Sequence, residues 1–193
     1  MTTAILTGIP GSGKTTVLTK ALEMLAEKDI SYKHVVYGTV MFEIAKEKGL
    51  VANRDEMRKL PVKSQKEVQL EAAGKIGDLG EKENIIVDTH CTVKTPKGFI
   101  PGLPSDVLAK INPSLIIIVE TDPAKIVARR EKDKSRARDE ETVEDLALHQ
   151  NMNRAFSAAY ALQSKASLKV VENREGRLDE AAKELAEVLE WSS

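Results

Sequence analysis

One segment near the start of the chain limits the fold more than any other. Residues 8–16 read GIPGSGKTT, after an apolar run at residues 4–6 and before an amphipathic pattern at residues 17–25. This order predicts a strand, a glycine-rich loop and a helix. Gly8, Gly11 and Gly13 permit backbone conformations that side chains forbid, so that several N–H groups can converge at the positive end of a helix. A loop of this kind can bind the phosphates of a nucleoside triphosphate.

Two side chains in this glycine loop (residues 8–16) have separate expected roles. Lys14 supplies a point charge that reaches the terminal phosphates, and the Thr15 hydroxyl is a ligand for a Mg²⁺ ion that bridges them. The alternative is a plain strand-to-helix turn in which the glycines only make a tight corner. Because the strand and the helix are both present in the pattern, we favour nucleotide binding.

Composition restricts the partners and the compartment. The chain has 193 residues, 41% of them hydrophobic, which is enough for one α/β domain with its own core. The net charge of −1 gives no electrostatic reason to expect nucleic acid or an anionic membrane as a partner. Cys91 is the one cysteine, and the chain runs into its first strand without a basic, apolar leader. We therefore expect a soluble, cytoplasmic protein.

Five short apolar runs alternate with helical patterns along the chain. They lie at residues 4–7, 34–37, 84–88, 115–120 and 168–172. Runs that are apolar at successive positions are typical of strands covered on both faces. The sequence therefore predicts a doubly wound, five-stranded parallel sheet in a P-loop NTPase-like α/β fold, as a single domain over residues 1–193.

Two regions are not accounted for by a minimal sheet with its connecting helices. Residues 38–80 carry so much helical pattern between the second and third runs that we expect a flap beside the phosphate site, able to hold a second substrate; this segment is called the insert. Residues 129–141, the arginine segment, hold four arginines within ten positions. Guanidinium groups engage phosphoryl oxygens in pairs of hydrogen bonds, so this segment is interpreted as a short lid. A solvated surface loop is the alternative.

Three residues at the end of the third run also carry predictions. Asp88 ends an apolar strand, as expected of a carboxylate that holds the water shell of a metal beside the phosphates. A simple turn or helix cap is the alternative. His90 is close enough in sequence to touch a phosphate or a ribose, and Cys91 is interpreted as a packed small side chain.

These motifs together resemble the archaeal type of adenylate kinase, most of all the methanogen enzymes. The resemblance covers essentially the whole chain, and its most specific part is the last of the four motifs. They are GIPGSGKTT at 8–16, YGTVMFEIA at 37–45, RDEMRKL at 54–60 and VDTHCTVKTPKGFIPGLP at 87–104, with the arginine segment after them.

The resemblance implies the reversible reaction ATP + AMP ⇌ 2 ADP with Mg²⁺, and a homotrimer. The acceptor is then a phosphate oxygen that is already ionised, so no general base is needed. The implied ATP-binding residues are Gly8, Ile9, Pro10, Gly11, Ser12, Gly13, Lys14, Thr15, Thr16 and Arg129. The implied catalytic residues are Lys14, Arg130, Arg136 and Arg138; those for AMP are Thr39, Arg54, Arg58 and His90; those for the metal are Thr15 and, through water, Asp88.

Two other functions are compatible with the glycine loop. The first is a different small-substrate P-loop kinase, acting on another nucleoside monophosphate or on a small hydroxyl acceptor, in which Asp88 would serve as the base. The second is a nucleotide-dependent switch of the GTPase kind. That class needs an Asn-Lys-x-Asp motif, which this sequence lacks.

Overall fold

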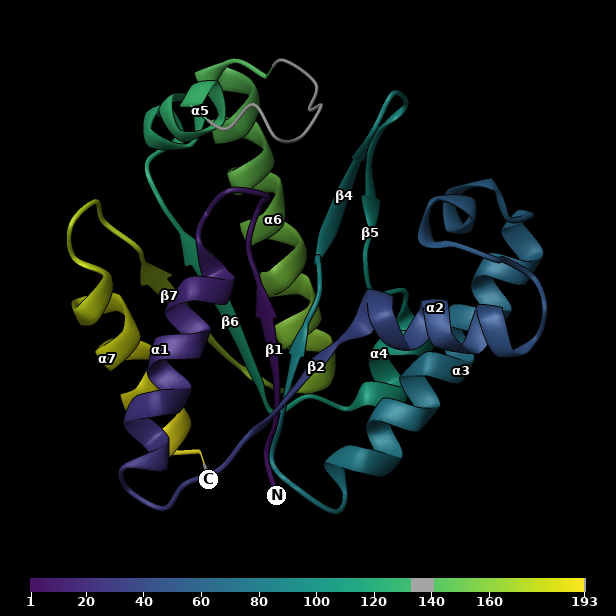
Figure 1. Cartoon of the computed structure of the whole chain (residues 1–193), viewed down its shortest axis with the longest axis horizontal. Helices are drawn as coiled ribbons and strands as arrows, with labels where there is room; N and C mark the ends of the chain where they lie inside the picture. The colour runs from purple at the N-terminus through teal and green to yellow at the C-terminus, as the bar shows by residue number, and fades with distance from the viewer. Residues whose placement is uncertain (133–140, 193) are drawn as a thin grey trace.

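The centre of the molecule is a five-stranded parallel sheet. The computed structural model describes residues 1–132 and 141–192 (Figure 1). The strands lie in the order β2-β3-β1-β6-β7, and each pairs in parallel with its neighbours. Their bounds are Thr3–Thr7 for β1, Lys33–Val36 for β2, Ile85–Asp88 for β3, Leu115–Glu120 for β6 and Ser167–Glu172 for β7. The five-stranded parallel sheet predicted from the sequence is thus confirmed.

The central strands are apolar at successive positions because both faces of the sheet are covered. β1 and β6 are buried along their whole length. Ile5 packs into the core on one face, while Leu6 packs into the core on the other. A strand between two such layers has no solvent face on which to place polar residues.

Helices form a layer on each face of the sheet. On one face α1 (Lys14–Ala26) packs with α7 (Leu178–Glu190). On the other face lie α6 (Val143–Ser164) and α4 (Ser105–Ile111), with α2 and α3 beyond them (Figure 1). α5 (Pro123–Lys132) follows β6 and packs against α6. This two-sided covering is the doubly wound arrangement.

Two helix starts are capped by side chains next to them in the sequence. The Asp122 carboxylate accepts a hydrogen bond from Ala124 N at 2.9 Å, with Pro123 as the first residue of α5. Thr142 and Asp145 form a capping box at the start of α6. Both caps satisfy backbone N–H groups that a helix leaves unpaired in its first turn.

The insert between β2 and β3 is helical, as predicted. It contains α2 (Tyr37–Glu47), the 3₁₀ helix η1 (Arg54–Lys59) and α3 (Val62–Gly80). The apolar face of α3 is buried at Val68, Ala72 and Ile76. Tyr37 was expected to end a strand but begins α2 instead, and its hydroxyl donates a hydrogen bond to Gln69 O at 2.8 Å. That bond fixes α2 against α3.

A β-hairpin between β3 and α4 was not predicted. It consists of β4 (Thr92–Thr95) and β5 (Gly98–Pro101), which pair antiparallel. Most of its residues are exposed, so neither strand carries the apolar run by which buried strands are recognised. Gly98, with φ +112°, follows the turn at residues 96–97 that joins the two strands.

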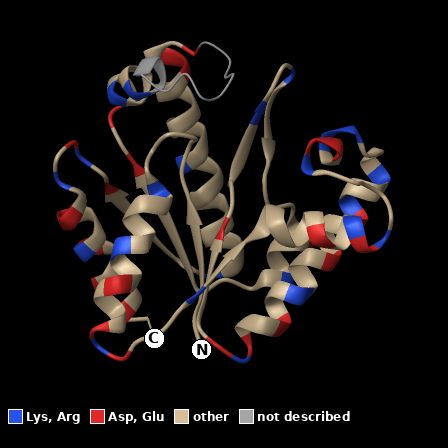
Figure 2. Cartoon of the chain, in the orientation of Figure 1, with Lys and Arg blue, Asp and Glu red and all other residues tan. Residues whose placement is uncertain are grey.

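Charged residues are spread over the helices rather than gathered by sign. Figure 2 shows Lys and Arg interleaved with Asp and Glu on both sides of the sheet. This mixture agrees with the net charge of −1. In the ranges 1–132 and 141–192, none of the helices combines the length and the hydropathy that a membrane span requires.

Tyr160 of α6 connects the base of the hairpin to the core. Its hydroxyl donates to Cys91 O at 2.9 Å and accepts from Leu103 N at 3.3 Å, and both of these residues are fully buried. Tyr160→Phe would remove the hydrogen bond of the buried Leu103 N–H and leave Cys91 O with the bond from Gly102 N alone, so we expect the free energy of unfolding to fall by about 1–3 kcal/mol. Urea unfolding measures this change. Tyr37→Phe, which removes one partly buried bond, should have the smaller effect; equal stability of Tyr160→Phe and the natural protein would contradict the assignment.

Candidate functional site

The glycine loop crosses the carboxyl edge of the sheet from β1 to α1. Gly11 has φ +99° and Gly13, the N-cap of α1, has φ +82°, conformations that L side chains rarely adopt. Ser12 N donates to Ile9 O at 3.1 Å and closes the turn. The loop therefore has the backbone course that the spacing of its glycines predicts.

Gly8 is required because the loop approaches β6 closely. A Cβ atom at Gly8 would lie 2.5 Å from Val119 O and 2.7 Å from Ser12 Oγ. The Ile9 side chain is buried with Ile126 and Leu146, so that only the backbone of Ile9 is available to a ligand. Of the other predicted residues around the turn, Ser12 is buried, whereas four are solvent-exposed: Pro10, Gly11, Thr15 and Thr16.

The side chain of Lys14 is paired with Asp88. The ammonium group donates a short hydrogen bond to Asp88 Oδ1, with 15% of the Lys14 and 9% of the Asp88 side chain exposed. The second oxygen of Asp88 lies 3.7 Å from His34 Nε2. Two predicted site residues are thus brought together, and His34, which no sequence motif marked, joins them.

Asp88 is ionised at neutral pH. Its burial favours the protonated acid, but contact with His34 and the hydrogen bond and charge of Lys14 outweigh burial and hold the pKa of Asp88 below its usual range. The residue ends β3 beside β1, and Thr89 N after it donates to Leu6 O at 3.1 Å. A carboxylate is therefore fixed next to the glycine loop.

His90 lies close to the same charges and remains partly exposed. The protein packed around it, followed by the charge of Lys14, lowers the pKa of His90, so that the ring is neutral at pH 7. Cys91, by contrast, is fully buried in the core, as predicted. Its N–H donates to Thr7 Oγ1 at 3.0 Å, and that hydroxyl donates to Asn153 Oδ1 at 3.2 Å.

Arg129 lies beside the glycine loop. Its Nη1 atom is 3.9 Å from the place that a Cβ atom at Gly13 would take, and its Nη2 atom is 3.6 Å from Glu175 Oε2 in the loop after β7. Arg130 belongs to α5. The other two predicted arginines, Arg136 and Arg138, lie outside the described residues.

The residues predicted for the second nucleotide belong to the insert. Arg54 Nη2 donates to Thr39 Oγ1 at 3.1 Å, so these two residues lie together. Arg58 is exposed on the same short helix, η1. In Figure 1 the insert stands apart from the glycine loop, with the hairpin between them. The fourth predicted residue, His90, lies at the sheet and not with this group.

Two polar groups at the same edge of the sheet were not predicted. Glu120, which ends β6, is buried and accepts hydrogen bonds from Arg154 Nε at 2.8 and 3.0 Å. Asn173, which directly follows β7, donates through Nδ2 to Ser12 O at 2.8 Å. A polar residue at the carboxyl end of a buried strand is the signal that marked Asp88, and it could also have marked these two.

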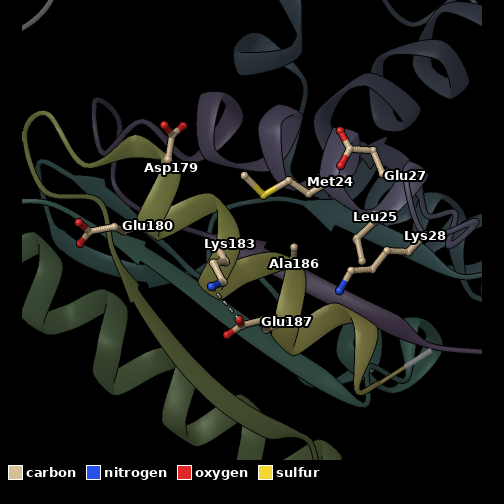
Figure 3. A pocket seen from close by; sticks show the side chains of 9 residues that line it. All are labelled: Met24, Leu25, Glu27, Lys28, Asp179, Glu180, Lys183, Ala186 and Glu187. Carbon is tan, nitrogen blue, oxygen red and sulfur yellow. Dashed lines mark ion pairs between the residues drawn. The ribbon is translucent and has the colours of Figure 1, made fainter.

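A separate concavity lies between α1 and α7, away from the predicted site. It has a volume of about 420 Å³ (Figure 3). Its lining consists of Met24, Leu25, Glu27, Lys28, Asp179, Glu180, Lys183, Ala186 and Glu187. No residue of the glycine loop or of the insert takes part in it.

The parallel sheet and the glycine loop together define a protein of the P-loop class. A family model described as an AAA domain matches residues 7–147. Adenylate kinase of Methanocaldococcus jannaschii is 50% identical over 185 residues, covering 96% of each chain, and that of Methanothermobacter thermautotrophicus is 49% identical over 190 residues, covering 98% of this chain and all of the relative. The chain belongs to the adenylate kinase family.

Solved structures support the fold at much lower identity. Shikimate kinase from Bacteroides thetaiotaomicron matches with a TM-score of 0.58 at 14% identity, covering 98% of both chains. Shikimate kinase from Acinetobacter baumannii, in complex with shikimate, matches with a TM-score of 0.59 at 15% identity, covering 98% of this chain and 94% of that one. These similarities concern the arrangement of strands and helices alone.

Proposed function

We propose that the protein transfers a phosphoryl group reversibly between ATP and AMP, giving two molecules of ADP. The observation that carries this proposal is the Lys14 ammonium group at the glycine loop, held against the ionised Asp88. Such a pair supplies a charge for the transferred group and a carboxylate for the water shell of the cation that accompanies it. AMP as acceptor follows from the near-complete match to curated adenylate kinases.

The chemistry needs alignment and charge neutralisation more than proton transfer. The attacking oxygen of AMP is an ionised phosphate oxygen at neutral pH, so no base has to remove a proton from it. The N–H groups of the glycine loop would hold the ATP phosphates, and Lys14 would stabilise the group in transfer. The residues proposed for ATP are those expected from the sequence, residues 8–16 and Arg129.

The donor set of the site fits Mg²⁺. Thr15 offers an exposed hydroxyl at the first turn of α1. Asp88 offers an ionised carboxylate, which is paired with Lys14, the residue before Thr15. Magnesium prefers such oxygen ligands and keeps several waters. Thr15 would hold the ion directly and Asp88 would orient its waters, and the charge supplied by the ion would neutralise the ATP phosphates.

The arginines form the third part of the proposal. Arg129 borders the glycine loop and would lie near the adenine of ATP. Arg130, Arg136 and Arg138 would converge on the transferring phosphoryl group, as part of a lid over residues 129–141. Guanidinium groups suit this task because they stay charged and form paired hydrogen bonds to phosphate oxygens.

The insert, residues 38–80, would bind AMP through Thr39, Arg54 and Arg58, with His90 at the sheet. Arg54 already bonds to Thr39, so Arg54→Ala should raise the KM for AMP by about 10- to 100-fold through loss of a charged hydrogen-bond donor. The KM for ATP should change little. Steady-state kinetics with each nucleotide varied in turn measures both constants.

Two variants complete that experiment. Arg54→Lys keeps the charge and loses the planar fork, so its KM for AMP should lie between those of Arg54→Ala and the natural protein. Arg177→Ala removes an exposed arginine that pairs with Glu180, and it should leave both constants unchanged. Equal changes in the two KM values of Arg54→Ala would remove Arg54 from the AMP side.

A panel of candidate acceptors tests which molecule receives the phosphoryl group. ADP formation from ATP is followed with AMP, with the other nucleoside monophosphates and with small hydroxy acids as acceptors. We expect AMP to be used at the highest kcat/KM. Turnover of another acceptor with none of AMP would overturn the proposed reaction and favour a different small-substrate kinase.

We also propose a cytoplasmic homotrimer. The family resemblance supports it, and so do Val93 and Ile100, a cross-strand pair on the hairpin whose residues are 41% and 48% exposed. The hairpin already contacts α6 through Lys94 and Asp145, and its open apolar pair offers a surface on which another copy of the chain would pack. Light scattering after size-exclusion chromatography would give the mass, and a monomer of 21.2 kDa at assay concentration would reject the trimer.

A further inference from the structure

Asn173 is a buried polar residue that the proposed reaction does not yet use. It directly follows β7 and is 6% exposed. Its backbone is fixed to the end of β6, because Asn173 N donates to Glu120 O and the Thr121 hydroxyl donates to Asn173 O, both at 2.7 Å. The side chain therefore starts from a rigid point on the sheet.

The amide of this side chain is aimed at the glycine loop. Nδ2 donates to Ser12 O at 2.8 Å, in a buried position. Because a backbone carbonyl only accepts hydrogen bonds, the nitrogen of the amide and not its oxygen must face Ser12. The contact thus requires a donor at residue 173.

The geometry of the peptide group turns this contact into a constraint on the loop. Ser12 O belongs to the peptide that joins Ser12 to Gly13, and in a trans peptide the carbonyl and the N–H point in opposite directions. A donor that fixes Ser12 O on one side consequently fixes Gly13 N–H on the other. That N–H group begins the helix whose positive end the loop presents.

Gly13 is matched to the same side chain. A Cβ atom at Gly13 would lie 2.4 Å from Asn173 Nδ2, so any other residue there would push the amide away. The φ of Gly13, +82°, is also unfavourable for other residues. Glycine at 13 and asparagine at 173 therefore depend on each other.

We propose that Asn173 is a positioning residue that orients the Ser12–Gly13 peptide so that Gly13 N–H can bind the ATP phosphates. This inference rests on the proposed function, and it gives the loop between β7 and α7 a role in ATP binding. Loss of the amide would free the peptide to rotate, and the loss would be felt at the ATP side alone.

The test compares Asn173→Ala and Asn173→Asp with the natural protein. Asn173→Ala should raise the KM for ATP, and the Kd of ATP measured by calorimetry, by about tenfold, the effect of one lost buried hydrogen bond. The KM for AMP should stay within about twofold. Asn84→Ala, which removes a single bond to Thr2 N at the opposite end of the sheet, is the control and should change neither constant.

Asn173→Asp supplies a readout that a merely structural role would not move. At neutral pH its carboxylate would face Ser12 O, acceptor against acceptor, and the KM for ATP should rise further than in Asn173→Ala. Burial and the facing carbonyl oxygen favour the protonated acid and raise its pKa, so that as the pH falls toward 5 its O–H can donate to Ser12 O. The ratio of its KM for ATP to that of the natural protein should therefore decrease between pH 8 and pH 5.

The outcomes separate the inference from the proposed function. If the natural protein does not phosphorylate AMP, the function fails, and the Kd of ATP still decides the role of Asn173. Unchanged ATP binding in both variants, or equal increases in both KM values, would overturn the inference. If Asn173→Ala does not fold, the isosteric Asn173→Asp decides through its pH dependence.

Discussion

Replacing Lys14 with alanine should lower kcat for ATP and AMP by about 10³-fold or more, the largest effect expected of any single substitution in this chain. Lys14 is the one side chain of the glycine loop with a positive charge, and it stands at the start of α1. Its charge matters most in the transition state, so kcat should fall much more than the affinity for AMP. Steady-state kinetics, with circular dichroism to confirm folding, measures the loss.

Lys28→Ala provides the matched control. Lys28 follows α1 at its other end and pairs with Glu190, far from the glycine loop. Its loss removes one lysine and leaves the proposed site untouched, so turnover should be unchanged. Near-normal turnover of Lys14→Ala would remove Lys14 from the catalytic residues.

Asp88→Asn should lower kcat by about 10- to 100-fold, because residues that orient the ligands of a metal have effects of this size. The substitution keeps the volume of the side chain and removes its charge. Lys14 then loses its anionic partner, and the waters of the proposed Mg²⁺ lose their acceptor. We also expect a higher Mg²⁺ concentration for half-maximal activity, measured by titrating the metal at saturating nucleotide.

An aspartate on the surface serves as the control here. Asp179→Asn removes a carboxylate that pairs with Lys20 on exposed helix faces, and both kcat and the Mg²⁺ requirement should stay as they are. If Asp88→Asn shows the same metal dependence as the natural protein, Asp88 has no part in holding the cation, and its role is limited to orienting Lys14.

The parts of the fold that were predictable are those in which one strong physical demand fixes the residue types. β6 lies between two apolar layers and must be apolar throughout, so residues 115–120 stand out in the sequence. The glycine loop needs positive φ at two positions and a close approach at a third, and only glycine meets these demands. Asp88 was found because it ends such a strand.

Other features depend on contacts between segments far apart in the sequence. His34 comes near Asp88 because β2 pairs with β3, and neither local pattern requires that contact. Asn173 meets Ser12 across 161 positions of the chain. The hairpin of β4 and β5 is held partly by Tyr160 of α6, which a reading of residues 92–101 alone could not supply.

The AMP-binding residues were predicted from motif resemblance. The structure explains why the residue pattern alone did not identify them. Arg54 and Arg58 lie on a 3₁₀ helix of six residues with no buried members, so no apolar periodicity marks it. Its start depends on Asn53, whose side chain accepts hydrogen bonds from Asp55 N and Glu56 N at 3.1 and 3.3 Å. A cap of this kind involves only neighbouring residues and can be predicted from them. The direction in which the two arginines point depends on how the helix packs in the fold, which the local sequence does not show.

The ion pair of Lys14 and Asp88 has a thermodynamic consequence. A polyanion that attracts the ammonium group competes with Asp88 for it, and each step by which the lysine turns away leaves the carboxylate with less positive charge beside it. A divalent cation can restore that charge. Nucleotide and cation should therefore favour each other's entry through an exchange of partners at a single aspartate, as linked equilibria and with no movement of the sheet.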